Sequence, residues 1–189
     1  MRPRWIAAVT AVLLSLALPA ASGHGGGGPG GPAEQAGHHG HTGQLDRLRD
    51  LTAPYAAGPA APWTIQVVDL AGITCIEDPR GTGAMGIHFV DGANLMDGAI
   101  DGAAPEALIY EPQPDGSLTL VGAEHLVLAE SWDADHQQVP MLHGQKFSLV
   151  EAGNRYGLPA FYELHVWHER ANPNGLFDDW NPTVSCPLS

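Results

Sequence analysis

Apolar and polar positions alternate in several short stretches of the chain, and this pattern predicts β-strands. Apolar, β-branched and aromatic residues dominate 63–70, 84–90, 107–111, 117–130 and 160–168. Glycine, proline and asparagine gather between these stretches, which is typical of turns and loops. We therefore expect a mainly β fold, or an α+β fold with one short N-terminal helix, arranged as a small antiparallel sandwich or barrel.

One connection carries a clear turn signal. Pro114, Asp115 and Gly116 lie between the stretches 107–111 and 117–130. Proline and glycine preset the dihedral angles that a chain reversal needs, so the two stretches are expected to pair as neighbouring strands.

The first residues have the three regions of a secretory signal peptide. Arginines precede an apolar run from Trp5 to Leu18, and small residues follow up to Gly23. The run is shorter than the roughly 20 residues that cross a bilayer, so we interpret 1–23 as a cleaved signal and not as an anchor. The protein is expected to be exported to the periplasm or the extracellular space and to be soluble after cleavage.

Residues 24–62 are rich in glycine and proline and offer few apolar side chains to bury. We predict a disordered leader with a short helix at 44–55, where leucines recur at three-residue spacing. The globular part is then a single β-rich domain at 63–189.

The leader also contains histidines. Unstructured histidines bind copper, nickel or zinc through neutral imidazoles, so the leader is a candidate auxiliary chelator. Its donors would be His24, His38, His39 and His41.

The acidic composition limits the classes of molecule that this protein is expected to bind. The formal net charge is −13 at pH 7, and the sequence has no basic stripe. Nucleic-acid binding needs clustered positive charge against the phosphates, so this class of function is excluded. No segment after the signal is apolar and long enough for membrane insertion. A metal ion or a small molecule remains as the expected partner.

The two cysteines, Cys75 and Cys186, predict a disulfide. In an oxidising compartment, an even number of cysteines in a small domain indicates pairing. The bond would close the fold by joining the start of the globular part to the C-terminus, and the chain-entropy model gives it about 4–5 kcal/mol of stabilisation. Two free thiols, or two thiolate metal ligands, are the alternatives.

Three residues with metal-ligating side chains lie in different predicted strands: His88, Glu124 and His165. Because strand side chains alternate between faces, Glu124 shares a face with Leu126 and Leu128 and interrupts an apolar surface. A buried carboxylate needs a partner, and imidazole with carboxylate suits zinc, copper, iron or manganese. We therefore predict a core metal site at these three residues. A hydrogen-bonded structural trio is the alternative, and spacing across strands does not decide between the two.

Other chemistries have less support in the sequence. Asp91, Asp97 and Asp101 lie in a glycine-rich loop, but without the spacing of an EF-hand, so ordinary Asp-Gly turns explain them. No serine lies in a nucleophile-elbow motif. Glu111 would have to meet a second strand carboxylate before glycoside hydrolysis could be considered.

Two motifs stand out in the body of the chain. They are Gly-x-Met-Gly-x-His at 83–88 and Leu-His-x-Trp…Asn-Pro-x-Gly-x-Phe…Trp-Asn-Pro-x-x-Ser-Cys at 164–186. With these motifs, residues 74–186 resemble a group of uncharacterised secreted bacterial proteins from high-GC organisms. That group has an aromatic residue in place of His125 and of His168, which makes both histidines local features of this chain. The resemblance implies a shared fold and gives no activity.

Three classes of function remain. A metal-binding protein would explain both the histidine-rich leader and the carboxylate on an apolar face. A small metal-dependent enzyme would use the same three ligands and keep an open position for water or substrate. A non-catalytic ligand-binding or structural module would need none of this chemistry.

Overall fold

Short apolar strands joined by tight turns form the framework of this protein. The computed structural model describes residues 36–186, with side chains from Gly43 onward. The predicted signal at 1–23 and the first part of the predicted leader, 24–35, lie outside the described residues. The elements are α1 (Ala36–Thr52), η1 (Ala53–Tyr55), β1 (Ile65–Gln66), β2 (Cys75–Glu77), β3 (Ala84–Val90), α2 (Gly92–Leu95), β4 (Ala107–Pro112), β5 (Leu118–Leu128), α3 (Ala129–Asp135), β6 (Met141–Leu142), β7 (Gln145–Lys146), β8 (Ser148–Val150) and β9 (Phe161–Val166).

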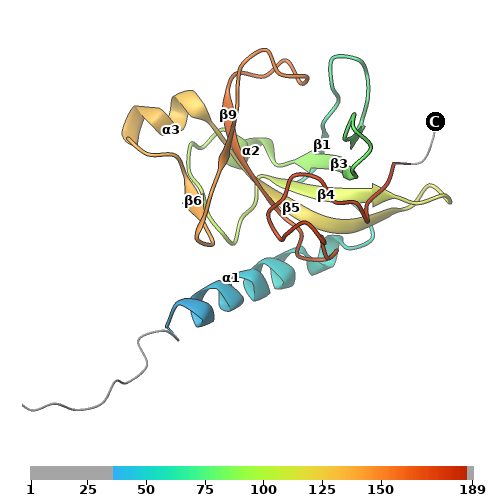
Figure 1. Ribbon diagram of the computed structural model, residues 1–189, viewed down its shortest axis with the longest axis horizontal. Helices are drawn as coiled ribbons and strands as arrows, with labels where there is room; N and C mark the ends of the chain where they lie inside the picture. The colour runs from blue at the N-terminus through green and yellow to red at the C-terminus, as the bar shows by residue number, and fades with distance from the viewer. Residues whose placement is uncertain (1–35, 187–189) are drawn as a thin grey trace, which may run out of the picture. The chain divides into compact units, whose positions relative to one another are not determined.

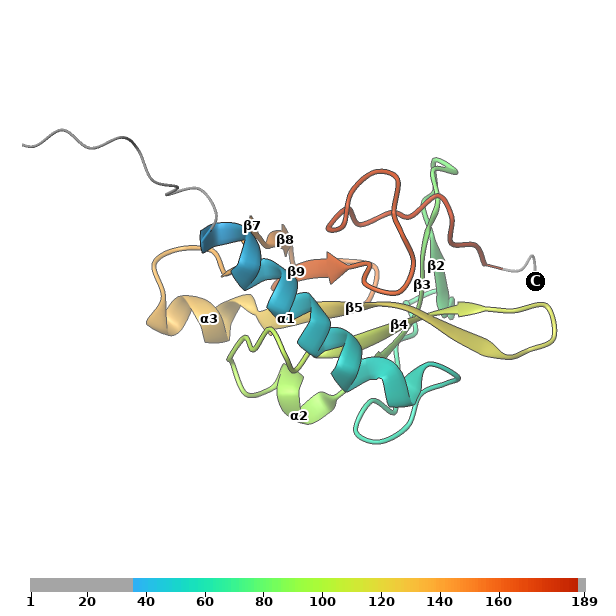
Figure 2. The same ribbon diagram turned by 90° about the horizontal axis from the view of Figure 1, so that it is seen from below.

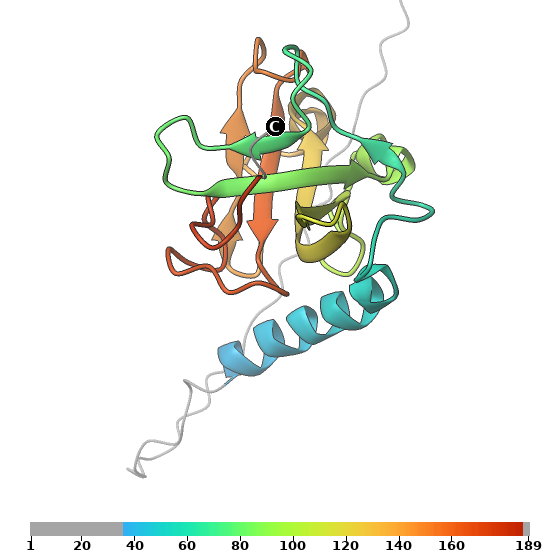
Figure 3. The same ribbon diagram turned by 90° about the vertical axis from the view of Figure 1, so that its right-hand side faces the viewer.

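The main sheet is antiparallel throughout. Its strand order is β1-β3-β4-β5-β9-β8, with β2 also paired to β3, while β6 and β7 form a separate hairpin (Figure 1). The sheet twists so strongly that the green strand β3 lies across the orange strand β9 in Figure 3. The predicted mainly β, antiparallel fold is confirmed. The sheet is not a closed barrel, because in the described residues it is open and has edges at β1, β2 and β8.

The strand boundaries follow the alternation closely except at the N-terminal end. β3 has the predicted bounds, and the ends of β4, β5 and β9 differ from prediction by one or two residues. In the stretch 63–70, only Ile65–Gln66 forms a strand. The side chain of Asp69 explains the early end, since its Oδ1 accepts hydrogen bonds from the backbone N–H groups of Ala71 and Ile73 at 2.9 and 2.8 Å. These bonds fold the chain into a turn.

The predicted short helix at 44–55 differs from the observed one. α1 begins at Ala36 and ends at Thr52, and it belongs to the same compact unit as the sheet. Leu48 is fully buried against apolar side chains of β4, β5 and β9, whereas Leu51 is exposed. Figure 2 shows α1 crossing these strands. The helix thus contributes to the core, and no helix in residues 36–186 has the length and apolarity needed to cross a membrane.

The two faces of the sheet have different surroundings. We call the face that packs against α1 the helix face and the opposite one the site face. Along the site face, two apolar clusters lie on either side of a polar band that contains His88, Glu124 and His165. The clusters are Val90, Ala107, Leu126 and Phe161 at one end, and Ala84, Ile109, Val121, Trp167 and Val184 at the other.

A disulfide between Cys75 and Cys186 confirms the predicted pairing. The two Cα atoms are 5.8 Å apart, and the bond joins residues separated by 111 positions. It links β2 to the C-terminal end of the described chain and so fixes the long segment that follows β9.

Candidate metal centre

Three strands place His88, Glu124 and His165 together on the site face. Glu124 is the register partner of His165 in the β5–β9 pair, so their side chains leave neighbouring strands in the same direction. β4 separates β3 from β5, and its residue opposite Glu124 is Ala107. The residue of β4 opposite His88 is Ile109, so His88 and Glu124 approach each other diagonally over β4 on the same face of the sheet. The three residues are buried, with exposed fractions of 4%, 6% and 0%.

The carboxylate of Glu124 lies between the two imidazole rings. Its Oε2 is 3.5 Å from His88 Nε2, and its Oε1 is 3.8 Å from His165 Nε2. The rings are arranged edge to face, with centroids 5.8 Å apart. One ligand atom from each residue lies within 4.8 Å of the other two. The structure therefore brings together three residues that the sequence could only assign to separate strands.

Two further carboxyl groups complete this set. Asp179 Oδ1 lies 3.6 Å from His165 Nδ1, on the side of the ring away from Glu124. Glu163, His165 and Asp179 form a second group whose ligand atoms lie within 4.8 Å of one another. Strand alternation contains a signal for Glu163, which shares a face of β9 with His165. Asp179 lies in an irregular segment and has no such signal. We call these five residues the site cluster: His88, Glu124, Glu163, His165 and Asp179.

Burial and neighbouring charges shift the pKa values of His88 and His165 in opposite directions. Burial, helped by the charge on His165, lowers the pKa of His88 to about 3, so this ring is neutral near pH 7 and has a free lone pair. Burial also disfavours protonation of His165. The carboxylates of Glu124, Asp179 and Glu163 outweigh it and raise the pKa of His165 to about 9. Without a metal ion, His165 therefore carries a proton at neutral pH.

The two buried glutamates are also displaced from their ordinary behaviour. Burial raises the pKa of Glu124 well above its usual range, and the positive charge on His165 opposes that rise. Burial likewise raises the pKa of Glu163, with His165 again opposing and Asp179 adding to the increase. The site cluster thus holds more acidic groups than one histidine cation can balance. Such crowding of displaced titratable groups is typical of functional sites.

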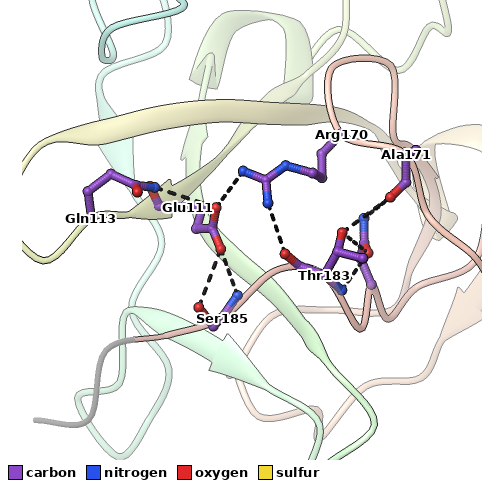
Figure 4. A network of polar contacts seen from close by, with 7 residues as sticks. Glu111, Gln113, Arg170, Ala171, Thr183 and Ser185 are labelled. Atoms are coloured by element: carbon purple, nitrogen blue, oxygen red, sulfur yellow. Dashed lines mark hydrogen bonds and ion pairs between the residues drawn. The ribbon is translucent and has the colours of Figure 1, made fainter.

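A polar network holds the segment that carries Asp179 (Figure 4). Arg170 Nη2 donates to Glu111 Oε2 at 2.7 Å, and the backbone N–H of Ser185 donates to Glu111 Oε1 at 3.0 Å. Arg170 Nη1 also donates to the carbonyl oxygen of Thr183 at 2.9 Å. Both carboxylate oxygens of Glu111 are used in this anchoring. We therefore assign Glu111 to holding the C-terminal segment against β4 and not to acid–base chemistry.

Two further buried histidines, His125 and His168, lie apart from the site cluster. His125 is fully buried, and its Nδ1 lies 3.6 Å from Glu106 Oε2. His168 Nε2 lies 2.9 Å from the hydroxyl of Thr52 in α1, and its Nδ1 lies 3.2 Å from the carbonyl oxygen of Val166. Burial lowers the pKa of His168 to about 4, so the ring is neutral. A neutral ring has a single N–H, which donates either to the carbonyl oxygen of Val166 or to the hydroxyl of Thr52.

The aspartates of the loop before β4 form turns. The Oδ1 atoms of Asp91, Asp97 and Asp101 each accept a hydrogen bond from the backbone N–H two residues later, at 2.9, 2.8 and 2.9 Å. This is the Asp-turn geometry expected from the sequence.

Of the leader histidines, His24 lies outside the described residues. His38, His39 and His41 lie in α1, and their side chains are outside the described part of the structure. Chelation by the leader therefore stays a prediction.

Comparisons of the chain with protein-family models, with curated proteins and with solved structures find no significant match. The resemblance to the group of secreted bacterial proteins accordingly stays a prediction. The function has to be argued from the site itself.

Proposed function

We propose that this protein binds a divalent transition metal ion through His88, Glu124 and His165. The observation that carries the proposal is the convergence of three buried ligand atoms from β3, β5 and β9 within 4.8 Å. Two imidazole nitrogens and a carboxylate oxygen form a donor set that suits zinc, iron, manganese or copper.

The spacing of the donor atoms supports an ion between them. Zinc–nitrogen and zinc–oxygen bonds of about 2.0–2.2 Å place two tetrahedral ligand atoms about 3.4 Å apart. Oε2 of Glu124 lies 3.5 Å from His88 Nε2, and its Oε1 lies 3.8 Å from His165 Nε2. Both distances are close to this value and too long for good hydrogen bonds. Within the described residues, neither nitrogen of His165 has a hydrogen-bond partner. A metal ion would satisfy polar atoms whose burial is otherwise costly.

Asp179 would act on the ion through His165. With Nε2 as the ligand atom, the Nδ1–H of His165 points toward Asp179, whose Oδ1 is 3.6 Å away. A carboxylate behind a metal-bound histidine fixes the tautomer and makes the ring a stronger donor. In this scheme the ion takes the place of the proton that His165 carries near pH 7, and binding releases that proton.

The test separates the core site from the leader. In the full-length mature chain, His24, His38, His39 and His41 are replaced by Gln. We expect this chain still to bind one zinc ion, measured by metal analysis after dialysis, and to melt at a higher temperature with zinc than without it. With these four histidines replaced, a rise in the melting temperature has to come from an ion bound to the folded core, because a ligand that binds only the folded state stabilises it.

Two further variants in the same background locate the site. Glu124→Gln keeps the size of the side chain and removes its charge, so we expect zinc affinity to fall at least about 10-fold. His136→Gln is the matched control, because His136 is exposed and stacks on Trp132 away from the site cluster. Zinc binding that disappears with the leader histidines, or that is the same in the Glu124→Gln variant, would contradict the core site.

A further inference from the structure

Three residues of the site cluster line a pocket on the site face. The pocket encloses about 50 Å³, and His88, Glu124 and Glu163 line its polar end. The rest of the lining is largely hydrocarbon and includes Val67, Leu95, Leu126, Leu158 and Phe161. Small-molecule sites in proteins combine apolar walls with a few convergent polar groups in this way.

The volume of the pocket limits the size of its ligand. Its 50 Å³ are about three times or more the roughly 10–15 Å³ of such space that one water molecule needs, but amount to only about a third of a cavity that holds benzene. A molecule with about two to four carbon atoms and one polar group matches this space. A sugar ring or a peptide does not.

The charge of the polar end selects the head group. Glu124 is a ligand of the proposed ion and Glu163 lines the same end of the pocket, so two carboxylates already balance a divalent charge. An anionic ligand would add a buried charge without a partner, which is costly. Tyr156 also lines the pocket and carries a hydroxyl, which is uncharged near pH 7. A neutral oxygen donor fits this end better than a carboxylate.

We infer that the pocket binds a short aliphatic alcohol, whose hydroxyl oxygen ligates the metal ion and whose hydrocarbon chain lies against Leu126 and Phe161. The inference rests on the proposed function, since it needs the ion at His88, Glu124 and His165. The hydroxyl hydrogen donates to the carboxylate of Glu163, which lines the same end of the pocket. The alcohol thereby uses both the polar end and the apolar wall.

Cobalt(II) in place of zinc provides a spectroscopic test. The full-length mature chain with Gln at the four leader histidine positions is loaded with cobalt and titrated with 1-propanol and, separately, with propionate. We expect 1-propanol to change the visible absorption of cobalt in a saturable way. It should bind at least about 10-fold more tightly than propionate, even though free carboxylates are good metal ligands.

A matched pair of substitutions tests the pocket wall. Val67 lines the pocket, and its backbone N–H donates to the carbonyl oxygen of His88 at 3.0 Å. Val67→Phe should fill the space, lower the affinity for 1-propanol at least 10-fold and keep the alcohol-free cobalt spectrum. Val68 is 48% exposed and is not among the lining residues, so Val68→Phe should leave both properties unchanged. If Val67→Phe fails to fold, Leu158→Trp gives the same test at a 41% exposed position of the wall.

The possible outcomes separate the two proposals. A core that binds no cobalt overturns both of them. Cobalt binding with a spectrum that 1-propanol does not change, or with propionate bound as tightly as 1-propanol, overturns the alcohol pocket and leaves the metal centre standing. The same holds if both Val67→Phe and Leu158→Trp fold and bind 1-propanol normally.

Discussion

Two glycines of the motif at 83–88 have a steric role in the fold. Gly83 has a φ of +138° and Gly86 a φ of +91°. Residues other than glycine rarely adopt such backbone conformations. A Cβ at Gly86 would lie 2.5 Å from the carbonyl oxygen of Tyr110, and one at Gly83 would lie 2.5 Å from the backbone of Asn181. These neighbours are main-chain atoms and cannot rotate away. Gly86 lets β3 approach β4 closely two residues before His88, and Gly83 lets the chain just before β3 approach the C-terminal segment.

A substitution at Gly86 tests this close approach. Gly86→Ala should lower the free energy of unfolding by about 3 kcal/mol, because the new methyl group adds both backbone strain and a main-chain clash. Gly81→Ala is the matched control, since Gly81 has a φ of +74° with nothing within 4 Å of the added Cβ. Gly81→Ala should lower the free energy of unfolding by only about 1–2 kcal/mol. Urea unfolding measures the stability of both variants. Equal losses of stability in the two would mean that the contact with Tyr110 does not constrain β3.

At the scale of single elements, α1 is attached to the sheet by polar as well as apolar contacts. Leu48 is buried in the helix-face core, and the Thr52 hydroxyl meets His168 at the end of the helix. Arg49 Nε also donates to the carbonyl oxygen of His168 at 3.2 Å. These contacts fix the C-terminal half of α1 to the chain just after β9. Since His168 is neutral in the folded state, the attachment depends on pH.

His168 should make the folded state less stable in acid. Burial lowers its pKa from 6.5 to about 4, so between these values the unfolded chain binds more protons than the folded one. The stability from this residue is therefore present above pH 6.5 and is lost as pH falls toward 4. The slope is at most about 1.4 kcal/mol per pH unit.

Urea unfolding at pH 7, 6 and 5 measures this effect. His168→Gln removes the titrating group, and we expect the loss of stability on acidification to be smaller than in the wild type. His88, whose pKa burial also lowers, is present in both proteins, so the difference between them reports His168 alone. An identical pH dependence in the two proteins would contradict a neutral, buried His168.

At the scale of the whole molecule, the disulfide connects β2 to the end of the C-terminal segment. Together with the Glu111 network, it determines where the segment after β9 runs and hence where Asp179 lies. Structural disulfides are typical of oxidising compartments, which is consistent with the predicted export. The site cluster therefore depends on covalent closure as well as on the register of the sheet.

Removing the disulfide should destabilise the entire unit. For the double variant Cys75→Ser and Cys186→Ser, we expect the free energy of unfolding to fall by about 2–5 kcal/mol, since the unfolded chain gains conformational freedom. Urea unfolding in oxidising buffer measures the loss. Reduction of the wild type should lower its stability to a similar extent and should leave the double variant unchanged. A wild type that is equally stable before and after reduction would contradict this role.

The sequence by itself determined the features that depend on local pattern. Alternation and turn residues located β3, β4, β5 and β9 to within two residues, and they showed that Glu124 interrupts an apolar face. The cysteine pair predicted the disulfide. These signals are readable because a strand's two faces and a turn's dihedral angles depend on residues close together in the chain.

Only the tertiary structure decided which distant residues meet. Alternation gives the face of a side chain but not its distance from a side chain two strands away, which depends on strand order, register and twist. Whether His88 meets Glu124 depends on β4, which separates their strands and places Ile109 opposite His88 and Ala107 opposite Glu124. Asp179 reaches His165 from an irregular segment, and α1 joins the core through the buried Leu48 and the contacts of Arg49 and Thr52 with His168. Such contacts follow from the packing of the whole unit, because no local pattern encodes the path of an irregular segment or the docking site of a helix.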